Sequence, residues 1–304
     1  MNCNHKVRVL MATHNGMPWL QAQINSIFAQ TDVNIELIIS DDTSSDNSLE
    51  YLINLAKSDS RVKLLSPLKF GSAGKNFYRL IQDVNIIGFD YIAFADQDDI
   101  WDDDKLISHI NLLKKHGAEA VSSNVMAFWP NGKKKLIKKS QPQRELDYLF
   151  ESAGPGCTFL MTPWLVNKVR EQLIDENSVA RVVTLHDWLT YAVCRAHGRK
   201  WIIDEKSSMQ YRQHGNNVVG ANSGLKAKWV RLMKLKQGWY RAEVIKVSAV
   251  CATISSEVKI KNIIYILSNK NIISQLNLLY YVLQARRKTL DRLVLYVLVL
   301  CFLF

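Results

Sequence analysis

The stretch that decides the fold is Tyr91–Trp101, YIAFADQDDIW, in which an apolar run leads directly into a group of carboxylates. The apolar part is too short for a typical helix and predicts a buried strand. A sheet interior does not accept an aspartate without a charge partner or a metal, so the acids are expected just past the strand's end. Open α/β sheets bind their ligands in the crevice at that end of the strands.

Asp96 and Asp98 are spaced so that both can point toward one site. Carboxylate oxygens are the ligands that a hard divalent cation prefers. The alternative is that these acids cap the helix expected to start near Lys105. Capping accounts for residues 102–104, but Asp96 lies too far ahead of the helix to be a cap. The sequence therefore predicts that Asp96 and Asp98 hold a metal or another ligand.

Strand-like and helix-like segments alternate around this stretch. Further apolar runs predict strands at 7–12, 35–40 and 62–65, with helices at 18–30, 48–58 and 76–84 between them. This alternation predicts an α/β fold with a mostly parallel sheet flanked by helices. Beyond residue 120 the pattern weakens. It predicts strands at 118–128, 159–162 and 201–203, helices at 164–173 and 186–197, a polar loop at 211–217, and helices from 224 to the end.

The composition of the 304 residues fits a globular protein, with 48% hydrophobic residues and a net charge of +11. Five scattered cysteines without Cys-x-x-Cys spacing argue against a disulfide framework or a zinc site, and suit a reducing cytoplasm. No segment reads as a signal peptide or is long enough to predict a membrane-spanning helix.

The positive charge is concentrated in Lys133–Lys139 and Lys226–Lys246. In the second block the charges alternate with Trp, Leu and Tyr, which predicts an amphipathic helix on an anionic membrane surface. The alternative is a solvated helical face above a buried stripe. Residues 286–292 repeat the basic pattern before an apolar tail, and no motif of a nucleic-acid-binding module occurs, so no nucleic acid is expected as a partner.

We expect a catalytic domain at 1–224, with a nucleotide-binding half at 1–115 and an acceptor-binding half at 116–224. Residues 225–304 would then form a helical extension that associates with the cytoplasmic face of the cell membrane. A lipid-linked acceptor would explain such an attachment.

A second acidic cluster, Asp41-Asp42, follows the strand expected at 35–40. Both acidic strand ends open on the same side of a doubly wound sheet, where a nucleotide fits. The alternative is that Asp41, Asp42 and Asp46 form a turn and cap the next helix.

Six short motifs lie between residues 7 and 220, namely ATHNG at 12–16, SDDTSSD at 40–46, FADQDDIW at 94–101, GPGCT at 154–158, LHDW at 185–188 and YRQHGNN at 211–217. In these motifs and their order, the chain resembles the family 2 glycosyltransferases, with the GT-A fold, that build bacterial surface polysaccharides. FADQDDIW and YRQHGNN are most similar to the rhamnosyltransferase branch, which uses dTDP-rhamnose.

The resemblance implies roles for individual residues. Asp187 would be the catalytic base, with a plain helix cap as the alternative. Asp98, helped by Asp96 and His214, would bind Mg²⁺ or Mn²⁺, although His214 could also be an ordinary loop histidine. The nucleotide-sugar would contact residues of several loops, namely Thr13, Asn15, Asp42, Gly71, Lys75, Asn76, Asp96 and Arg212. His14 stands where many members carry Tyr, so it stays open whether this side chain stacks on the nucleotide base.

The expected activity is a metal-dependent, inverting hexosyl transfer from a nucleotide-sugar to a lipid-linked saccharide of an O-antigen or capsule. The donor would be dTDP-rhamnose, with a UDP- or GDP-sugar as the alternative. A nucleotidyltransferase would need a Gly-rich phosphate loop, which residues 13–18 lack. The non-enzymatic alternative is a membrane-associated scaffold or nucleotide-sugar-binding protein.

Overall fold

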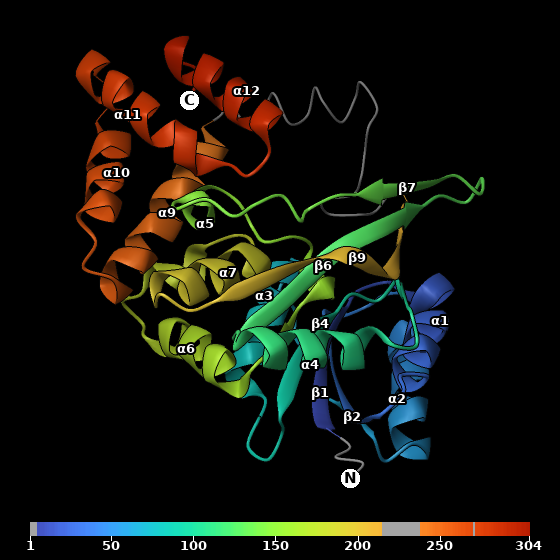
Figure 1. Cartoon of the computed structure of the whole chain (residues 1–304). Coiled ribbons are helices and arrows are strands. Elements are labelled where there is room, and N and C mark those ends of the chain that lie inside the picture. Colours follow the sequence, from blue (N-terminus) through green and yellow to red (C-terminus); the bar gives the residue numbers. More distant parts are fainter. Residues whose placement is uncertain (1–4, 215–237, 270) are drawn as a thin grey trace.

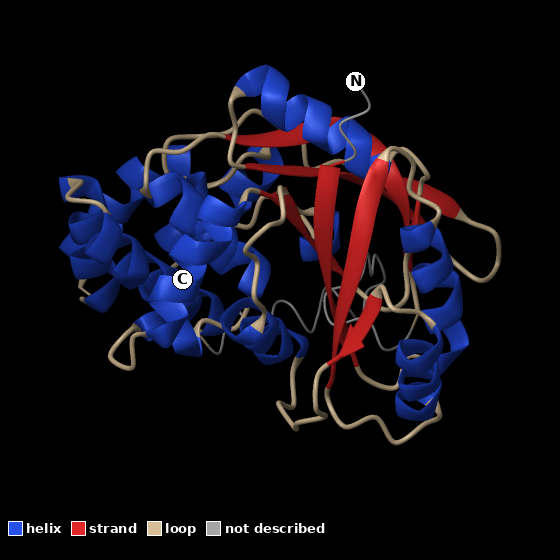
Figure 2. Ribbon diagram, turned by 90° about the horizontal axis from the view of Figure 1, so that it is seen from below, coloured by secondary structure: helices blue, strands red, loops and turns tan. Residues whose placement is uncertain are grey.

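The computed structural model describes residues 5–214, 238–269 and 271–304. It contains a mixed sheet with strand order β3-β2-β1-β4-β8-β6-β9-β5, and β7 pairs with β6 outside this path. Helices cover both faces of the sheet, and a group of C-terminal helices lies at one end of the molecule (Figures 1 and 2). The α/β fold expected from the sequence is therefore confirmed.

The first half of the chain forms the parallel part of the sheet. Its strands are β1 (His5–Thr13), β2 (Val33–Asp41), β3 (Val62–Leu64) and β4 (Tyr91–Ala95). They are connected and followed by α1 (Met17–Phe28), α2 (Ser48–Ser58), α3 (Ala73–Asp83) and α4 (Lys105–His116). Both faces of β1 are buried, which is why its sequence is apolar at successive positions instead of alternating.

The second half completes the sheet with both strand directions. Its strands are β6 (Ala120–Phe128), β7 (Lys134–Ile137), β8 (Leu160–Met161) and β9 (Trp201–Arg212), joined by the two-residue β5 (Ile100–Trp101). Its helices are α5 (Asp147–Phe150), α6 (Pro163–Ile174) and α7 (His186–Ala196), with short 3-10 turns at Gly156–Thr158 and Val179–Val182. β8 runs antiparallel to β4 and β6, whereas β9 runs parallel to β6.

The expectation of a short strand at 201–203 and a polar loop from 211 was wrong. β9 runs to Arg212, so that Tyr211 and Arg212 pair with Ala127 and Phe128 of β6. Polar residues and register shifts within the pair hide this strand from a periodicity argument. The remaining motif residues 215–217 lie outside the described part of the chain.

The C-terminal region is helical in its described residues, with α9 (Trp239–Ile254), α10 (Val258–Ser268), α11 (Ile272–Ala285) and α12 (Thr289–Leu300). These helices share one buried apolar cluster with α3, α6 and α7. Within α9, Val244 and Val247 are fully buried in that cluster. The C-terminal helices are therefore packed onto helices of the part of the chain that contains the sheet.

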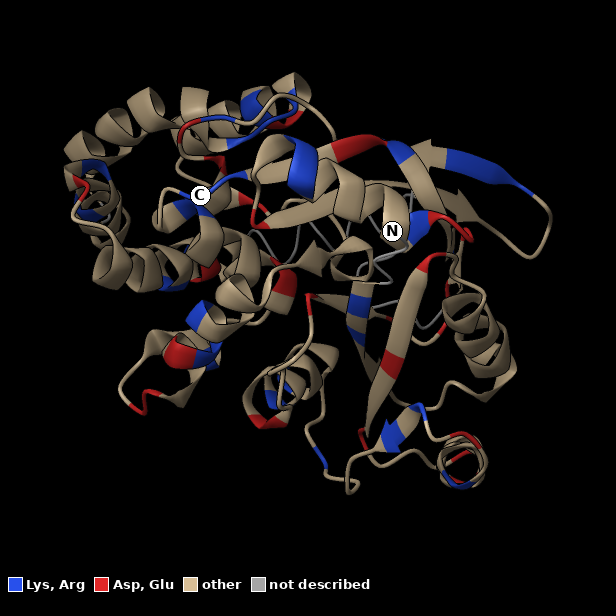
Figure 3. Cartoon of the chain, turned by 60° about the horizontal axis from the view of Figure 1, so that its bottom comes forward, with Lys and Arg blue, Asp and Glu red and all other residues tan. Residues whose placement is uncertain are grey.

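Most of the basic segment that was expected to face a membrane, residues 226–236, lies outside the described residues. Two of the described arginines of this region turn inward instead. Arg241 donates to the carbonyl oxygens of Leu267 and Phe304, and Arg287 is only 3% exposed. Figure 3 shows that Lys and Arg gather on β7, whereas long parts of the C-terminal helices carry no charge. None of the described helices is long and apolar enough to cross a membrane.

Candidate active site

The carboxyl ends of β1 and β2 are fastened together by side chains of the loops that follow them. Asn15, whose φ of 49° is in the left-handed region, accepts from the N–H of Ser45 at 2.7 Å. Thr13 Oγ1 donates to the buried Asp41 at 2.9 Å. Thr13 and Asp41 are thus hydrogen bonded to each other below the surface. Asn15 connects the loop after β1 to the loop after β2.

Asp42 holds the loop that precedes α3. Its Oδ1 accepts from the N–H groups of Phe70 and Gly71, and its side chain is largely buried. Gly71 has a φ of +71°, a conformation that favours glycine. Asn76 lies behind this loop and donates to the carbonyl oxygen of Ser40 at 2.8 Å, so it braces the end of β2 from within. Lys75, in contrast, is exposed.

The loop after β1 is joined directly to the acidic motif after β4. Gln97 Oε1 accepts from the N–H of His14 at 2.7 Å, and Gln97 Nε2 donates to the carbonyl oxygen of His14 at 2.9 Å. A Cβ at Gly16 would lie 2.4 Å from Gln97 Oε1, so a larger residue there would displace the amide group of Gln97. This pair places the predicted nucleotide edge beside the predicted metal site.

Asp96 and Asp98 lie together at the end of β4. Burial, the charge of Asp98 and the charge of Asp187 raise the pKa of Asp96 to about 7. Asp99 is fully buried, and its pKa is raised by burial and by Asp98. The charges of Asp98 and Asp187 are thus near enough to act on Asp96, and those of Asp98 and Asp96 act on Asp99.

His214 and Arg212, at the end of β9, complete this group. His214 Nε2 lies 2.5 Å from Asp98 Oδ2, and the imidazole stacks on Trp19 of α1 with ring centroids 4.0 Å apart. Arg212 donates its Nε–H to the carbonyl oxygen of Asp98 at 2.8 Å. Thus the acidic motif is attached to the end of β9.

The chemistry of these donors fits a divalent cation. Asp96 and Asp98 offer the hard oxygens that Mg²⁺ and Mn²⁺ prefer. Asp99 Oδ2 is buried and has no hydrogen-bond partner among the described residues. The ligand atoms of Asp96, Asp99 and Cys157 also lie within 4.8 Å of one another. The Cys157 thiol is buried with a strongly raised pKa, which makes it a poor ligand for either cation.

A buried lysine lies behind the acids. Lys105 is fully buried, its ammonium lies 3.9 Å from the centroid of the Trp101 ring, and Asp99 is near enough to raise its proton affinity. Burial nevertheless lowers the pKa of Lys105 to about 7. The Lys105 ammonium is buried without a hydrogen-bond partner among the described residues.

Asp187 is the second residue of α7 and reaches the same site from the other side. Its Oδ1 accepts from the N–H of Trp188 at 2.7 Å, and Lys139 and the Ser152 hydroxyl lie close enough to favour the carboxylate. Burial outweighs these effects and raises the pKa of Asp187 to about 6. A carboxyl group with this proton affinity suits proton abstraction near neutral pH.

His186, the residue before Asp187, packs against aromatic side chains. Its ring stacks on Phe77 with centroids 4.0 Å apart, and its Nε2 is buried without a partner among the described residues. Burial lowers the pKa of His186 to about 3, so the ring is neutral. Two glycines permit this packing. A Cβ at Gly156 would lie 2.5 Å from His186 Nε2, and one at Gly74 would lie 2.3 Å from the carbonyl oxygen of Thr184.

Four residues of this site were not found from the sequence: Trp19, Lys105, Lys139 and Ser152. Trp19 and Lys105 stand at ordinary helix positions, where an aromatic or a lysine attracts no attention. Lys139 was read only as part of a basic block. The GPGCT motif two residues after Ser152 was the available signal, because it marks a loop that packs tightly on Asp187.

A sheet with acidic residues at the ends of β2 and β4, and a further acid on a helix facing them, is the architecture of a GT-A glycosyltransferase. Solved structures agree with this fold. The chain superposes on Staphylococcus aureus TarS 1–349 in complex with UDP-GlcNAc with a TM-score of 0.53, at 12% identity, covering 86% of this chain and 79% of that one. The mannosyltransferase PcManGT from Pyrobaculum calidifontis, in complex with GDP-Man and Mn²⁺, gives 0.54 at 13% identity, covering 87% and 69%.

The chain belongs to glycosyl transferase family 2, whose sequence profile matches residues 8–161. It is 45% identical over 240 residues to the dTDP-rhamnosyl transferase RfbG of Shigella flexneri, which covers 78% of this chain and 83% of that protein. It is 30% identical over 168 residues to the UDP-Glc:alpha-D-GlcNAc-diphosphoundecaprenol beta-1,3-glucosyltransferase WfgD of Escherichia coli, covering 54% and 63%. The protein is thus a glycosyltransferase enzyme, and the resemblance to the rhamnosyltransferase branch is confirmed.

Proposed function

We propose that this glycosyltransferase transfers L-rhamnose from dTDP-rhamnose to a lipid-linked saccharide during the synthesis of a bacterial cell-surface polysaccharide. The similarity to a dTDP-rhamnosyl transferase supports the donor. The observation that supports the chemistry is that the charge of Asp187 is near enough to Asp96 to raise the pKa of that carboxyl group. In this proposal a base and a diphosphate-binding centre therefore share one site.

In this proposal, the donor's nucleoside lies on the edge formed by Thr13, Asn15 and Asp42. Asp42 already orders the loop at Gly71, so that backbone and carboxylate together can contact the pyrimidine and ribose. The exposed Lys75 and the half-buried Arg212 would contribute positive charge near the diphosphate. Asn76 contributes indirectly, because it is buried and keeps the end of β2 in place.

Asp98, with Asp96 and His214, would hold Mg²⁺ or Mn²⁺, and when bound this ion neutralises the diphosphate so that it can leave. The protein's part is to aim the two carboxylates. Gln97 secures their loop to His14, and Arg212 secures it to β9. Preorganised groups of this kind cost no rearrangement when the bond breaks.

Asp187 would accept the proton of the acceptor hydroxyl as that oxygen attacks the anomeric carbon. The N–H of Trp188 and the start of α7 stabilise the carboxylate before the proton arrives. Attack on the face opposite the diphosphate inverts the anomeric centre without a covalent intermediate, so a β-linked donor would give an α-rhamnoside.

Two further functions would fit parts of the site. A UDP-sugar would occupy the same edge, as the E. coli relative's name indicates for that protein. A non-catalytic nucleotide-sugar-binding protein would need Asp42 and Asp98 but would have no use for Asp187. The raised pKa of Asp187 favours a proton-transfer role over this alternative.

The test is a donor screen with purified full-length protein, in which release of the nucleoside diphosphate from dTDP-rhamnose, UDP-glucose and GDP-mannose is measured with and without Mn²⁺. We expect metal-dependent release from dTDP-rhamnose alone, and its loss in the Asp98→Ala variant. Release from a UDP-sugar instead would overturn the donor assignment. No release from any donor, together with nucleotide binding, would favour the scaffold protein.

We further propose that the C-terminal helices attach the enzyme peripherally to the cytoplasmic face of the cell membrane. α11 and α12 each carry an exposed apolar stripe with the spacing i, i+3, i+7, i+10, which marks one face of a helix. Such a face enters the interface of a bilayer without spanning it. The stripes consist of Ile273, Leu276, Tyr280 and Leu283, and of Leu290, Leu293, Val297 and Leu300.

Vesicle flotation tests this attachment with liposomes that contain anionic lipid. The double variant Leu293→Asp/Val297→Asp should stay in the soluble fraction, because it places two charges on the stripe. Ile87→Asp is the matched control, since Ile87 is 84% exposed but lies before β4, far from α12 in the chain. If the wild-type protein does not float, or if it forms a stable dimer through these helices, the membrane attachment is refuted.

A further inference from the structure

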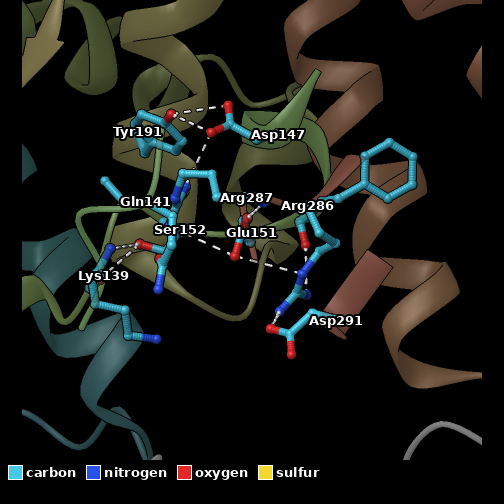
Figure 4. A network of polar contacts seen from close by, with 12 residues as sticks. Lys139, Gln141, Asp147, Glu151, Ser152, Tyr191, Arg286, Arg287 and Asp291 are labelled. Carbon is cyan, nitrogen blue, oxygen red and sulfur yellow. Dashed lines mark hydrogen bonds and ion pairs between the residues drawn. The ribbon is translucent and has the colours of Figure 1, made fainter. Parts of the chain in front are cut away.

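A buried polar network joins the C-terminal helices to the part of the chain that contains the sheet (Figure 4). Its centre is Arg287, which follows α11 and whose side chain is 1% exposed. Its Nη1 lies 3.3 Å from Asp147 Oδ2, and its Nη2 donates to the carbonyl oxygen of Ser152 at 2.6 Å. Its backbone N–H donates to the carboxylate of Glu151. One residue thus binds α5 and the two residues that come after it.

The first connection to the active site runs through the loop at 151–156. Arg287 fixes the backbone of this loop at Ser152, and the Ser152 hydroxyl donates to the carbonyl oxygen of Gly154 at 2.9 Å. The same hydroxyl lies near enough to the Asp187 carboxylate to lower the pKa of Asp187. The loop also packs directly on Asp187, because a Cβ at Gly156 would lie 3.3 Å from its Cβ. A shift of the loop would therefore move a partner of the base.

The second connection runs through α7. Asp147 is fully buried and accepts from the Tyr191 hydroxyl at 3.0 Å and from Arg195 Nη1 at 3.2 Å. Tyr191 and Arg195 follow Asp187 at intervals of four residues, so all three lie on one face of the helix. Arg287 therefore holds both the loop beside the base and the helix that carries it.

Simple attachment of the C-terminal helices does not require such a network. Apolar contacts already bury Val244, Val247 and Val250 of α9 in one cluster with α3, α6 and α7. Buried ion pairs are a costly way to add stability, because both charges lose their hydration. What a guanidinium adds is directional control over the atoms it binds, and here those atoms lead to Asp187.

We propose that Arg287 is a positioning residue for the transfer reaction, through which the C-terminal helices set the geometry of the catalytic base. This inference rests on the proposed role of Asp187. It implies that the C-terminal region has a part in catalysis that is separate from membrane attachment.

The experiment compares full-length variants in transfer assays with dTDP-rhamnose, with nucleotide binding measured separately. Arg287→Gln should lower kcat about 10- to 100-fold, the range expected when a catalytic group is misplaced slightly. The Kd for dTDP with Mn²⁺ should stay within about twofold, because a positioning defect in the base leaves uniform binding intact. Arg241→Gln is the matched control. It removes another buried arginine, whose hydrogen bonds to described residues stay within the C-terminal region, and it should lower the melting temperature but leave kcat nearly unchanged.

A second pair of variants keeps the test decisive if Arg287→Gln does not fold. Ser152→Ala should lower kcat, and Ser152→Thr, which keeps the hydroxyl, should restore it. The double variant Ser152→Ala/Arg287→Gln should lose less than the product of the single losses, because both act on one chain of contacts.

Wild-type kcat in either Arg287→Gln or Ser152→Ala would overturn the inference. So would an equal loss of kcat in Arg241→Gln, since that would reduce the effect to general destabilisation. Failure of the proposed function looks different. In that case Asp187→Asn itself would retain transfer. If Asp187→Asn is inactive and Arg287→Gln is fully active, only the positioning role is refuted.

Discussion

Replacing Asp187 with Asn is expected to stabilise the folded protein while it abolishes sugar transfer. Asn keeps the shape of the side chain and the oxygen that accepts from the N–H of Trp188 at 2.7 Å. It lacks the negative charge, which burial makes costly at this position. It also cannot accept a proton from the acceptor hydroxyl.

The size of the effect follows from the pKa. Burial raises the pKa of Asp187 from 3.8 to about 6, so ionising it in the folded state costs roughly 3 kcal/mol at high pH, at about 1.4 kcal/mol per pKa unit. Because the carboxyl group is partly exposed, water reduces this cost, and we expect a gain of roughly 1–3 kcal/mol. That gain corresponds to a rise in melting temperature of about 2 °C per kcal/mol in a chain of this size.

Thermal unfolding of both proteins over a range of pH measures the gain. The folded state binds a proton at Asp187 more tightly than the unfolded chain does, so the wild-type protein gains stability as the pH falls through about 6. The advantage of Asp187→Asn should therefore be largest well above pH 6 and fade toward pH 4. Asp32→Asn, at an exposed residue, controls for the change in net charge.

Two outcomes would refute this reasoning. If Asp187→Asn melts below the wild type at high pH, the carboxylate is stabilised by the fold and its raised pKa is wrong. A stability difference that does not change with pH would show that the effect does not come from this ionisation.

Three further predictions concern the same site. Asp98→Ala should abolish transfer and weaken Mn²⁺ binding, measured by calorimetry, because it removes an oxygen of the proposed metal site and a partner of His214. Gly74→Ala should lower the free energy of unfolding by about 1–3 kcal/mol, since its Cβ would lie 2.3 Å from the Thr184 carbonyl oxygen; an unchanged denaturant midpoint would contradict this. Asn76→Ala should cost about 1–3 kcal/mol and raise the Kd for dTDP, because the buried carbonyl of Ser40 loses its donor; tight dTDP binding in a destabilised variant would separate the two effects.

The parallel half of the fold could be predicted because burial on both faces leaves a direct trace in the sequence. β1, β2 and β4 are short apolar runs, and each ends in polar residues at the edge of the site. β9 left no such trace. It carries polar residues in its middle and shifts register against β6, so periodicity revealed only its first three residues.

The acids of the site were found because they break the apolar pattern, but their partners were not. Lys139 and Ser152 lie 48 and 35 positions before Asp187 in the chain, and no local rule connects residues at such separations. Arg287 was read as a surface charge because a basic residue beside an apolar tail suits a membrane. Its buried acceptor, Asp147, is 140 residues away.

The buried acids themselves argue that this site is kept for chemistry. Burial raises the pKa of Asp96, Asp99 and Asp187, so each carboxylate is held in the folded protein at a cost in stability. Neutral side chains of similar size at these positions would give a more stable sheet edge. Carboxylates in a low-dielectric site bind a cation and accept a proton more strongly than they would in water. In the proposed mechanism, the acids that lower the stability of the fold also bind the metal ion and accept the proton more strongly when the sugar leaves its diphosphate. This is why Asp187→Asn should lower activity and raise stability.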